Sequence, residues 1–417
     1  MAERIETDVA VVGAGPAGVA AACRAAECGA RVVLVDENPR PGGQIWRHGA
    51  AAAIPAAARA WLARLQRSGA RLVMGAAVVD AAPEAWLLVE QGGHCLRIEA
   101  RQLVLATGAR ELFLPFPGWT LPNVMGVGAA QALLKSGVSF RGREVVVAGS
   151  GPLLLPVAAA LAAAGARLRL VAEQAPAADV RRFAAGLWRQ PGRLAQAARY
   201  RAGFLRTPYR TGVWIAAARG DGRLQQVTLT DGRATWSMAC DLLCCAHGLV
   251  PNLELPRLLR CGLAQGAVAV DEQQRTSLAA VYCAGEPTGV GGVERALVEG
   301  EIAGLAAADQ PAEAGLRARR ARLRRFAAAL RAAFRPRDEL RRLADPRTLV
   351  CRCEDVALSR LQPGWGMRQA KLVTRTGMGP CQGRICGPAL EFLFGWEPDT
   401  VRPPLKPVAL SILGEEP

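Results

Sequence analysis

Three glycines near the N-terminus have the spacing of a turn that binds a dinucleotide. Gly13, Gly15 and Gly18 form the pattern G-x-G-x-x-G, and Asp36 follows roughly 20 residues further on. In such a turn the first glycine makes the sharp bend, the second lets the backbone approach a pyrophosphate, and the third lets helix and strand pack closely. The phosphates then lie at a helix N-terminus, and the acid holds a ribose hydroxyl group. The spacing therefore predicts a dinucleotide site.

The segments around these glycines have the composition of a strand–helix–strand unit. Residues 9–12 and 31–35 are apolar runs typical of buried parallel strands, and residues 17–26 have helical composition. Pro16 suits the first turn of a helix, where a missing N–H costs no hydrogen bond. Strand, turn, helix, strand and acid in this order are far more specific than glycines alone. The alternative is a turn-forming glycine cluster in another kind of α/β protein.

Three later loops carry residues suited to a flavin bound at this turn. The first follows Asp36, and its glycines allow close approach to a flat ring while a glutamine offers an amide. Two apolar strands further along the chain end in glycine loops, and the second of these loops supplies a carboxylate that can bind a ribityl chain. We therefore predict FAD. Besides the glycine turn, the residues assigned to FAD are Asp36, Glu37, Gly43, Gln44, Thr107, Gly108, Gly285 and Glu286.

The opening pattern repeats in a second unit. A strand at 144–148 leads into Gly149 and Gly151, a helix follows from Leu154, and the next strand ends on Glu173. An internal duplication of this kind is informative, although Leu154 replaces the third glycine. We predict an NAD(H) site here. The alternatives are a vestigial Rossmann domain and a site for another adenine nucleotide. If NAD(H) binds, Glu173 disfavours the 2′-phosphate of NADPH by like charge.

The most specific pattern lies near the C-terminus. Cys351 and Cys353 form C-x-C, and Cys381 and Cys386 form C-x4-C after a gap. Four thiolates can hold a [2Fe–2S] cluster, and clustered cysteines in a cytosolic chain indicate metal rather than disulfides. Zinc is the rival, but structural zinc sites usually present C-x-x-C pairs. A third alternative is no metal at all. We predict that these four cysteines bind a [2Fe–2S] cluster.

The other cysteines and the histidines suggest no catalytic set. The second unit has no C-x-x-C pair for dithiol redox chemistry, and His48, His94 and His247 give no convincing acid–base set for amine oxidation. Catalytic residues therefore stay unassigned. We expect the remaining cysteines to act as small, buried apolar residues. These are Cys23, Cys28, Cys95, Cys240, Cys244, Cys245, Cys261 and Cys283.

The net charge of +16 is concentrated in two stretches. Residues 179–210 hold eight arginines and one acid, and residues 313–345 hold eleven arginines and four acids. In the second stretch Leu316, Leu323 and Leu330 recur at helical spacing, which predicts an amphipathic helix with an arginine face. No nucleic-acid recognition motif accompanies the charge, so we expect no nucleic-acid partner.

The order of these patterns predicts an α/β protein with two Rossmann-like dinucleotide-binding domains, one inserted in the other, and a small helical C-terminal [2Fe–2S] domain. We expect the FAD domain at 1–112 and 246–310, the inserted NAD-type domain at 113–245, a basic linker helix at 311–345 and the cluster domain, with a proline-rich tail, at 346–417. No signal-peptide-like region or bilayer-length apolar run is evident, which predicts a cytoplasmic protein.

These patterns resemble known families at two levels. The two Rossmann-like units with their glycine loops resemble the two-dinucleotide-domain flavoproteins, over about residues 5–310. The whole chain resembles the α subunits of multisubunit bacterial amino-acid and opine dehydrogenases, which include octopine and nopaline oxidases, hydrogen cyanide synthase B, D-hydroxyproline dehydrogenase and dye-linked proline dehydrogenase. The matching stretches are ENPRPGGQIWR, RELFLPFPGWTLPNV, GSGPLLLPVAAAL, GLVPN, CRCEDV and TRTGMGPCQGRICGP. The last two resemble bacterioferritin-associated-ferredoxin-like domains.

The resemblance implies a function that residue types alone do not. In such complexes a β subunit, itself a flavoprotein, oxidises the amine, and the α subunit relays electrons through its flavin and cluster, in some cases with a small ferredoxin-like subunit. Contact with a membrane would then be peripheral and through partners. Two alternatives stay open: a self-sufficient NAD(P)H:acceptor oxidoreductase, and a basic scaffold protein.

Overall fold

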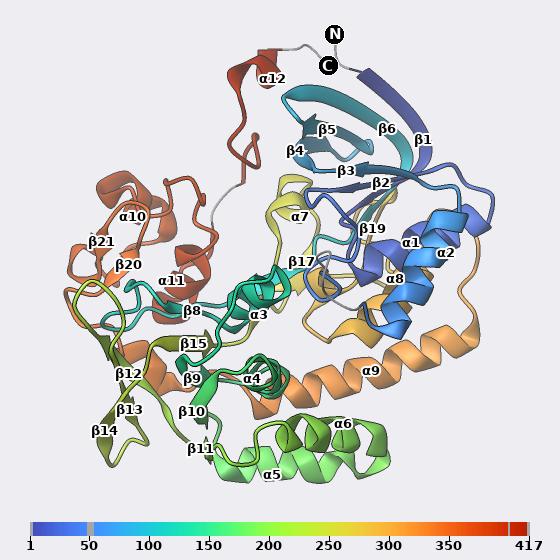
Figure 1. Ribbon diagram of the computed structural model, residues 1–417. Coiled ribbons are helices and arrows are strands. Elements are labelled where there is room, and N and C mark those ends of the chain that lie inside the picture. Colours follow the sequence, from blue (N-terminus) through green and yellow to red (C-terminus); the bar gives the residue numbers. More distant parts are fainter. Residues whose placement is uncertain (1–2, 48–53, 399–400, 415–417) are drawn as a thin grey trace. The chain divides into compact units, whose positions relative to one another are not determined.

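The computed structural model describes residues 3–47, 54–398 and 401–414, which fall into two compact units (Figure 1). Unit 1 consists of Met1–Arg110, Val250–Ala327 and Thr400–Pro417, and unit 2 consists of Glu111–Leu249 and Ala328–Asp399. The predicted fold class is thus seen as two α/β units, one interrupting the other. The finer domain boundaries stay a prediction, and the cysteine-rich segment lies in the same unit as the predicted second dinucleotide domain.

A seven-stranded sheet forms the centre of unit 1. Its strand order is β3-β2-β1-β6-β5-β4, with β19 pairing with β6; the pairs formed by β1, β2, β3, β6 and β19 are parallel, and β4, β5 and β6 form an antiparallel ribbon. Alternate residues of β1 face opposite cores, with Val9 and Val11 on one side and Ala10 and Val12 on the other. The strands are β1 (Glu3–Val12), β2 (Val32–Asp36), β3 (Arg71–Met74), β4 (Ala76–Ala82), β5 (Trp86–Gln91), β6 (His94–Leu105) and β19 (Val281–Cys283).

Helices α1 (Pro16–Glu27) and α8 (Val293–Ala307) pack side by side in unit 1 (Figure 1). Two glycines of α8 make the close approach possible. A Cβ atom built at Gly300 would lie 2.1 Å from the Ala17 carbonyl oxygen, and one built at Gly304 would lie 2.3 Å from the Ala21 carbonyl oxygen. Helix α2 (Ala56–Arg67) also contacts α1. The tightly packed α1 fixes the glycine turn that precedes it.

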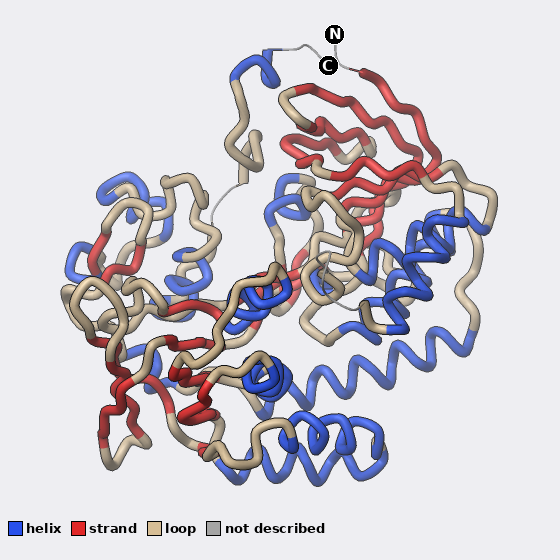
Figure 2. Tube along the Cα trace, in the orientation of Figure 1, coloured by secondary structure: helices blue, strands red, loops and turns tan. Residues whose placement is uncertain are grey.

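A five-stranded parallel sheet, in the order β11-β10-β9-β15-β8, forms the centre of unit 2. Helix α4 (Leu154–Ala163) connects β9 to β10, which repeats the strand–helix–strand arrangement of unit 1. The other main sheet of this unit has three antiparallel strands, β12 (Trp214–Arg219), β13 (Gln226–Thr230) and β14 (Thr235–Ala239) (Figure 2). The parallel strands are β8 (Val124–Gly126), β9 (Glu144–Gly149), β10 (Arg167–Glu173), β11 (Tyr209–Thr211) and β15 (Leu242–Ala246).

Helices account for both basic stretches. The first contains α5 (Ala177–Gly186) and α6 (Pro191–Ala202), and the second contains the 20-residue helix α9 (Ala314–Ala333) (Figure 2). Helix α9 buries Leu323 and Ala327, as its spacing predicts, and exposes most of its arginines. Among the described residues, no helix combines the length and the apolar character needed to cross a membrane.

The cysteine-rich segment has a small core of its own within unit 2. It contains the antiparallel pair β20 (Leu349–Cys351) and β21 (Val356–Ala357), followed by α10 (Met367–Thr374) and α11 (Cys386–Phe394). The indole Nε1 of Trp119 donates a hydrogen bond of 2.6 Å to the Leu349 carbonyl oxygen. This bond ties the segment to the loop that precedes β8.

Candidate cofactor sites

The first glycine turn has the geometry that a pyrophosphate needs. Gly13 has φ +104°, and a Cβ atom there would lie 2.2 Å from the Ala106 carbonyl oxygen. A Cβ atom at Gly18 would lie 1.7 Å from the Gly13 carbonyl oxygen, so this position also needs glycine. A Cβ atom at Gly15 would meet no atom within 4 Å, and α1 begins at the next residue. The turn therefore leaves open space beside a helix N-terminus, where anions bind.

Asp36 lies at the C-terminal end of β2, directly beside this turn. Its carboxylate accepts hydrogen bonds from the Ala14 backbone N–H at 2.6 Å and from the backbone and side-chain nitrogens of Asn38, each at 2.7 Å. Glu37 is exposed and forms an ion pair with Lys406. Burial lowers the pKa of Lys406, and the charge of Asp36 opposes this effect. Lys406 was not predicted from sequence, because it comes from the distant C-terminal tail.

The loop after β2 folds back onto the glycine turn. The Gly42 backbone N–H donates a 2.7 Å hydrogen bond to the Ala14 carbonyl oxygen. Gly43 has φ +58°, and a Cβ atom there would lie 2.9 Å from the Gly15 Cα atom. Gln44 follows with an exposed side chain. The glycine at position 43 therefore allows the two loops to touch, which leaves the Gln44 amide available to a ligand.

Thr107 and Gly108 follow β6 and are held by Asn252. The Thr107 hydroxyl donates to the Asn252 carbonyl oxygen at 2.9 Å, and the Asn252 side chain donates to the Thr107 carbonyl oxygen at 2.8 Å. The Asn252 backbone N–H also donates to the Gly108 carbonyl oxygen at 3.0 Å. The guanidinium of Arg110 binds both Asn252 and Glu254. Asn252 belongs to the stretch GLVPN, and its role here was not predicted from the sequence.

Gly285 and Glu286 follow β19 at the same edge of the sheet. Gly285 has φ +82°, and a Cβ atom there would lie 2.8 Å from the Ala17 Cβ atom. The Glu286 carboxylate accepts hydrogen bonds from the backbone N–H groups of Gly291 at 3.2 Å and Gly292 at 2.9 Å. Burial raises the pKa of Glu286. Here the carboxylate stabilises the loop before α8, and its predicted contact with a ribityl chain stays a prediction.

A buried acid beneath this loop was not predicted from sequence. Glu299 in α8 has no exposed surface and accepts hydrogen bonds from the Gly285 backbone N–H at 3.1 Å and the Thr288 hydroxyl at 2.7 Å. It also pairs with Arg295 at 2.8 Å and lies within 4 Å of Arg320. Its spacing of four residues from Arg295 in a helix is the sequence pattern that could have revealed it. Glu299 fixes the conformation of the loop that carries Glu286.

The sequence-predicted FAD residues thus gather at one edge of the unit 1 sheet. They lie on loops at the C-terminal ends of the parallel strands β1, β2, β6 and β19. Open parallel α/β sheets bind ligands at this edge. Their assignment to individual atoms of FAD stays a prediction.

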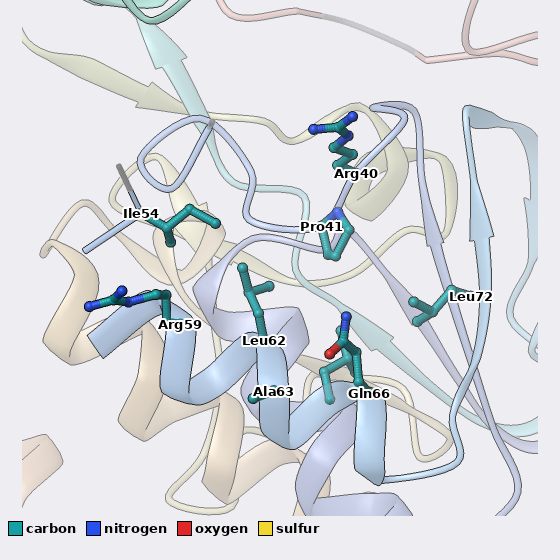
Figure 3. Close-up of a pocket in the computed structure, with 9 residues that line it drawn as sticks. Arg40, Pro41, Ile54, Arg59, Leu62, Ala63, Gln66 and Leu72 are labelled. Atoms are coloured by element: carbon teal, nitrogen blue, oxygen red, sulfur yellow. The ribbon is translucent and has the colours of Figure 1, made fainter. Parts of the chain in front are cut away.

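A separate pocket of unit 1 lies on α2 (Figure 3). Arg59, Leu62 and Gln66 from the helix line it together with Arg40 and Pro41 from the loop after β2. None of the predicted cofactor residues is among its lining residues. We assign no ligand to it.

The second glycine turn reproduces part of the first. Gly149 has φ +148°, and a Cβ atom there would lie 1.8 Å from the Ala246 carbonyl oxygen. Glu173 has no exposed surface, and its carboxylate accepts hydrogen bonds from the backbone N–H groups of Gly151 at 2.7 Å and Ala175 at 2.8 Å. Burial raises the pKa of Glu173 to about 7. Its role towards a ribose stays a prediction.

The four C-terminal cysteines form two pairs. Cys351 interacts with Cys386, and Cys353 interacts with Cys381. The hydrogen bond with Cys386 lowers the pKa of Cys351 to about 6, which favours its thiolate. The Gly377 backbone N–H donates to the Cys351 sulfur at 3.5 Å. Within the described part of the chain, no three His, Cys, Asp or Glu side chains group closely enough to hold one metal ion.

Glycines make room around these sulfurs. A Cβ atom at Gly379 would lie 2.3 Å from the Cys353 Cβ atom, and Gly377 and Gly383 both have φ +78°. Cys351 and Cys386 are buried, whereas Cys353 is exposed. The segment therefore keeps one pair buried, whereas the other pair has one exposed and one half-buried cysteine.

Most of the remaining cysteines and one histidine are structural. The predicted burial of the other cysteines is confirmed, except that Cys28 is exposed because it caps the C-terminal end of α1. Burial raises the pKa of Cys23 to about 11. His247 is buried, and burial lowers its pKa to about 4, so it is neutral at pH 7. His94 is exposed at the start of β6, and His48 lies outside the described residues.

This fold and this glycine turn define a dinucleotide-dependent oxidoreductase. A family model for pyridine nucleotide-disulphide oxidoreductases matches residues 7–308. The chain belongs to this family of FAD- and NAD-binding enzymes, which supports the predicted flavin cofactor.

Two relatives within this comparison are named as subunits of enzymes. The chain is 36% identical over 453 residues to an opine oxidase subunit of Rhizobium meliloti (strain 1021), with 97% of each chain covered. It is 32% identical over 420 residues to hydrogen cyanide synthase subunit HcnB of Pseudomonas aeruginosa, with 90% of each covered. Both relatives are named as subunits, so they work with other chains. The predicted resemblance to these proteins is confirmed, and the cluster domain stays a prediction.

Solved structures agree on the fold. L-proline dehydrogenase from P. horikoshii superimposes with a TM-score of 0.71 at 20% identity, covering 100% of this chain and 81% of that one. Thioredoxin reductase from T. acidophilum superimposes with a TM-score of 0.57 at 20% identity and covers 73% of this chain. The first of these two matches covers the whole chain, whereas the second covers about three quarters of it.

Proposed function

We propose that the chain is the electron-transfer subunit of a heteromeric dehydrogenase for amino acids or opines, such as proline, hydroxyproline, octopine or nopaline. It would hold FAD in unit 1 and a [2Fe–2S] cluster at Cys351, Cys353, Cys381 and Cys386. A partner flavoprotein would oxidise the amine, and this chain would pass the electrons to an acceptor. The observation that carries the proposal is the arrangement of four cysteines as two pairs in an oxidoreductase chain.

The residues of unit 1 fit FAD. The open space at Gly15 faces the start of α1, and Asp36 lies beside the same turn. Gly43 and Gly285 allow close packing around this turn, and Gln44 offers an exposed amide. A flavin supplies redox chemistry that can join two-electron and one-electron steps. The protein supplies its binding and orientation.

The cysteine arrangement fits two irons better than one zinc. A [2Fe–2S] cluster is held by four thiolates, two on each iron, whereas a structural zinc ion needs four ligands around a single centre. The two pairs match the first arrangement. The Gly377 N–H bond to the Cys351 sulfur is the kind of contact that tunes a cluster's potential.

The position of the histidines supports a relay rather than amine oxidation in this chain. Oxidation of a C–N bond calls for groups that bind the substrate and handle its proton. Neither described histidine lies on the loops assigned to FAD: His94 begins β6, and His247 is buried in unit 2. The partner subunit would provide this chemistry.

Exposed apolar side chains near the cysteines support a partner surface. Leu372 is 77% exposed and Val373 is 57% exposed on α10, and Met378 and Ile385 are also exposed in the loop between the cysteines. Cys353 is exposed in the same segment. Apolar surface next to a redox centre fits docking of another protein, whether the amine-oxidising subunit or a small ferredoxin-like one.

The test is to separate the two cofactors by substitution. Cys353→Ser removes one thiolate from the exposed pair, so iron and acid-labile sulfide should fall at least severalfold while flavin content is kept, because the FAD loops lie in unit 1. Cys28→Ser, which also removes an exposed thiol, is the matched control and should keep its iron. About one zinc per chain with no iron, or unchanged iron in Cys353→Ser, would contradict the cluster assignment.

A further inference from the structure

The two glycine turns of this chain differ in what lies against their second glycine. At Gly15 a Cβ atom would meet nothing within 4 Å. At Gly151, the equivalent position in unit 2, a Cβ atom would lie 3.8 Å from the Phe334 Cβ atom and 3.9 Å from its Cγ atom. A side chain therefore lies in contact with the second turn at the position where the first turn is open.

Hydrogen bonds hold the segment Phe334–Arg337 on the second turn. The Ser150 hydroxyl donates to the Phe334 carbonyl oxygen at 2.6 Å. The Gln174 side chain donates to the Arg335 carbonyl oxygen at 2.9 Å and accepts from the Arg337 backbone N–H at 3.1 Å. Ser150 lies between the two glycines, and Gln174 follows the acid at the end of β10. Both residues hold positions from which a dinucleotide-binding turn would contact its ligand.

Aromatic contacts add to these bonds. The Phe334 ring packs edge-on against Phe183 of α5, with ring centroids 5.2 Å apart. The guanidinium of Arg337 lies over the ring of Trp214, 4.4 Å from its centroid. Both ends of the segment are therefore anchored within unit 2.

The helix that follows the second turn begins later, relative to its glycines, than the helix that follows the first. Helix α1 begins at Pro16, directly after Gly15, whereas α4 begins at Leu154, three residues after Gly151. The Leu154 backbone N–H donates to the Gly151 carbonyl oxygen at 3.1 Å. The Leu154 N–H at the start of the helix is therefore already hydrogen-bonded and is not available to a phosphate.

We propose that Phe334–Arg337 closes the second dinucleotide site against pyridine nucleotides and so determines the electron donor of this oxidoreductase. When a site is open in only a fraction of the molecules, the apparent affinity for its ligand is the intrinsic affinity multiplied by that fraction. NADH would have to displace the segment from Ser150, Gln174 and Gly151 before its pyrophosphate could reach the turn. The chain then takes its electrons through unit 1 and not from NADH. This inference does not depend on the cluster or on the partner subunit.

The test measures NADH binding to the full-length chain before and after the segment is loosened. The double variant Ser150→Ala/Phe334→Ala removes the hydroxyl bond and the ring that faces Gly151. Leu330→Ala, one helical turn earlier in α9, is the matched control. Hydrogen exchange over residues 330–340 reports whether the segment is released, and calorimetric titration with NADH reports binding.

We expect no saturable NADH binding below millimolar concentrations in the wild type and in Leu330→Ala. In the double variant, exchange over 330–340 should accelerate and NADH should bind at least tenfold more tightly than to the wild type. Micromolar binding by the wild type would overturn the proposal. If the double variant does not release the segment, Gln174→Ala is added until exchange shows release; a released segment with no gain in NADH binding would also overturn it.

Discussion

At the scale of single residues, the three glycines of the first turn have different roles. Gly13 and Gly18 are required by backbone conformation or by contact with a carbonyl oxygen, so a larger residue would disturb the fold itself. Gly15 has φ −71° and open space around its missing side chain. Packing within the protein therefore does not require glycine at this position, so Gly15 is a direct place to test the predicted cofactor site.

Gly15→Ala should fold normally and lose flavin. The methyl group would point into the open space assigned to the pyrophosphate, and such overpacking costs about 1–3 kcal/mol, or roughly one to two orders of magnitude in affinity. Flavin absorbance per chain after gel filtration and the thermal midpoint of the apoprotein measure the two effects. Gly13→Ala is the contrast and should lower the midpoint as well. Full flavin occupancy in Gly15→Ala would place the pyrophosphate elsewhere.

Glu173 should make the stability of unit 2 depend on pH. Burial raises its pKa from 4.5 to about 7, so the folded chain holds a proton that the unfolded chain has released. The contribution of this group to the free energy of unfolding is fully present below pH 4.5. It is lost as the pH rises through about 7, and the loss amounts to up to about 3 kcal/mol. The neighbouring Tyr209 shares this burial, which raises its own pKa, but it titrates at much higher pH.

Glu173→Gln removes this titration and is the direct test. We expect the thermal midpoint of the wild type to decrease as the pH rises from 5 to 7.5. The midpoint of the variant should change less. The variant should be less stable than the wild type at pH 5. Both carboxyl oxygens of Glu173 accept hydrogen bonds from backbone N–H groups, and the NH₂ group of glutamine cannot accept one of them. Parallel pH profiles for the two proteins would show that Glu173 is ionised in the folded chain.

At the scale of elements, the contact between α1 and α8 shows how glycine positions a site through packing. Gly304→Ala would bring a methyl group 2.3 Å from the Ala21 carbonyl oxygen, so the helices would have to separate. We expect a loss of about 1–3 kcal/mol. Gly315→Ala in α9 is the matched substitution, since a Cβ atom there meets nothing within 4 Å, and it should be neutral or stabilise by up to about 1 kcal/mol. Thermal midpoints that move equally in both variants would contradict this interpretation.

The sequence predicts elements well where the pattern is local. The first strand–turn–helix and its repeat in unit 2 were predicted from apolar runs and glycine spacing, and the structure has α1 at Pro16–Glu27 and α4 at Leu154–Ala163. The helix expected over residues 17–26 begins one residue earlier and ends one residue later than expected. Periodicity marks the apolar face of a helix but not its ends, which depend on capping.

Contacts between distant segments could not be predicted from the sequence. Asn252 holds Thr107, Lys406 reaches Glu37, and Phe334 lies against Gly151, although each pair is far apart in the chain. No local spacing encodes such meetings, because they arise when separate strands and loops come to the same sheet edge. The second glycine turn shows the consequence: its sequence predicted a nucleotide site, and only the structure reveals the segment that lies on it.

At the scale of the whole molecule, the arginines fit a protein surface better than a nucleic-acid groove. Helix α9 buries Leu323 and Ala327 and directs Arg320 into the protein, where it reaches the Asp271 carbonyl oxygen at 2.8 Å and Glu299. The remaining arginines of α9 are mostly exposed on the other side of the helix. A charged face on a packed helix, beside relatives that are named as subunits, is typical of association with other chains.

The isolated chain should therefore not dehydrogenate any amino acid or opine at a useful rate. Its FAD loops offer Gln44, Thr107 and Glu286 as polar side chains, but Thr107 is engaged by Asn252 and Glu286 by the loop before α8. Steady-state dye reduction with proline, hydroxyproline and opines, first with the single chain and then with the co-expressed complex, is the measurement. We expect turnover only in the complex, within the common enzymatic range of about 1–1000 per second. Turnover in that range by the single chain would make it the catalytic component and exclude the relay, whereas NADH-driven dye reduction by the single chain would instead contradict the closed second site.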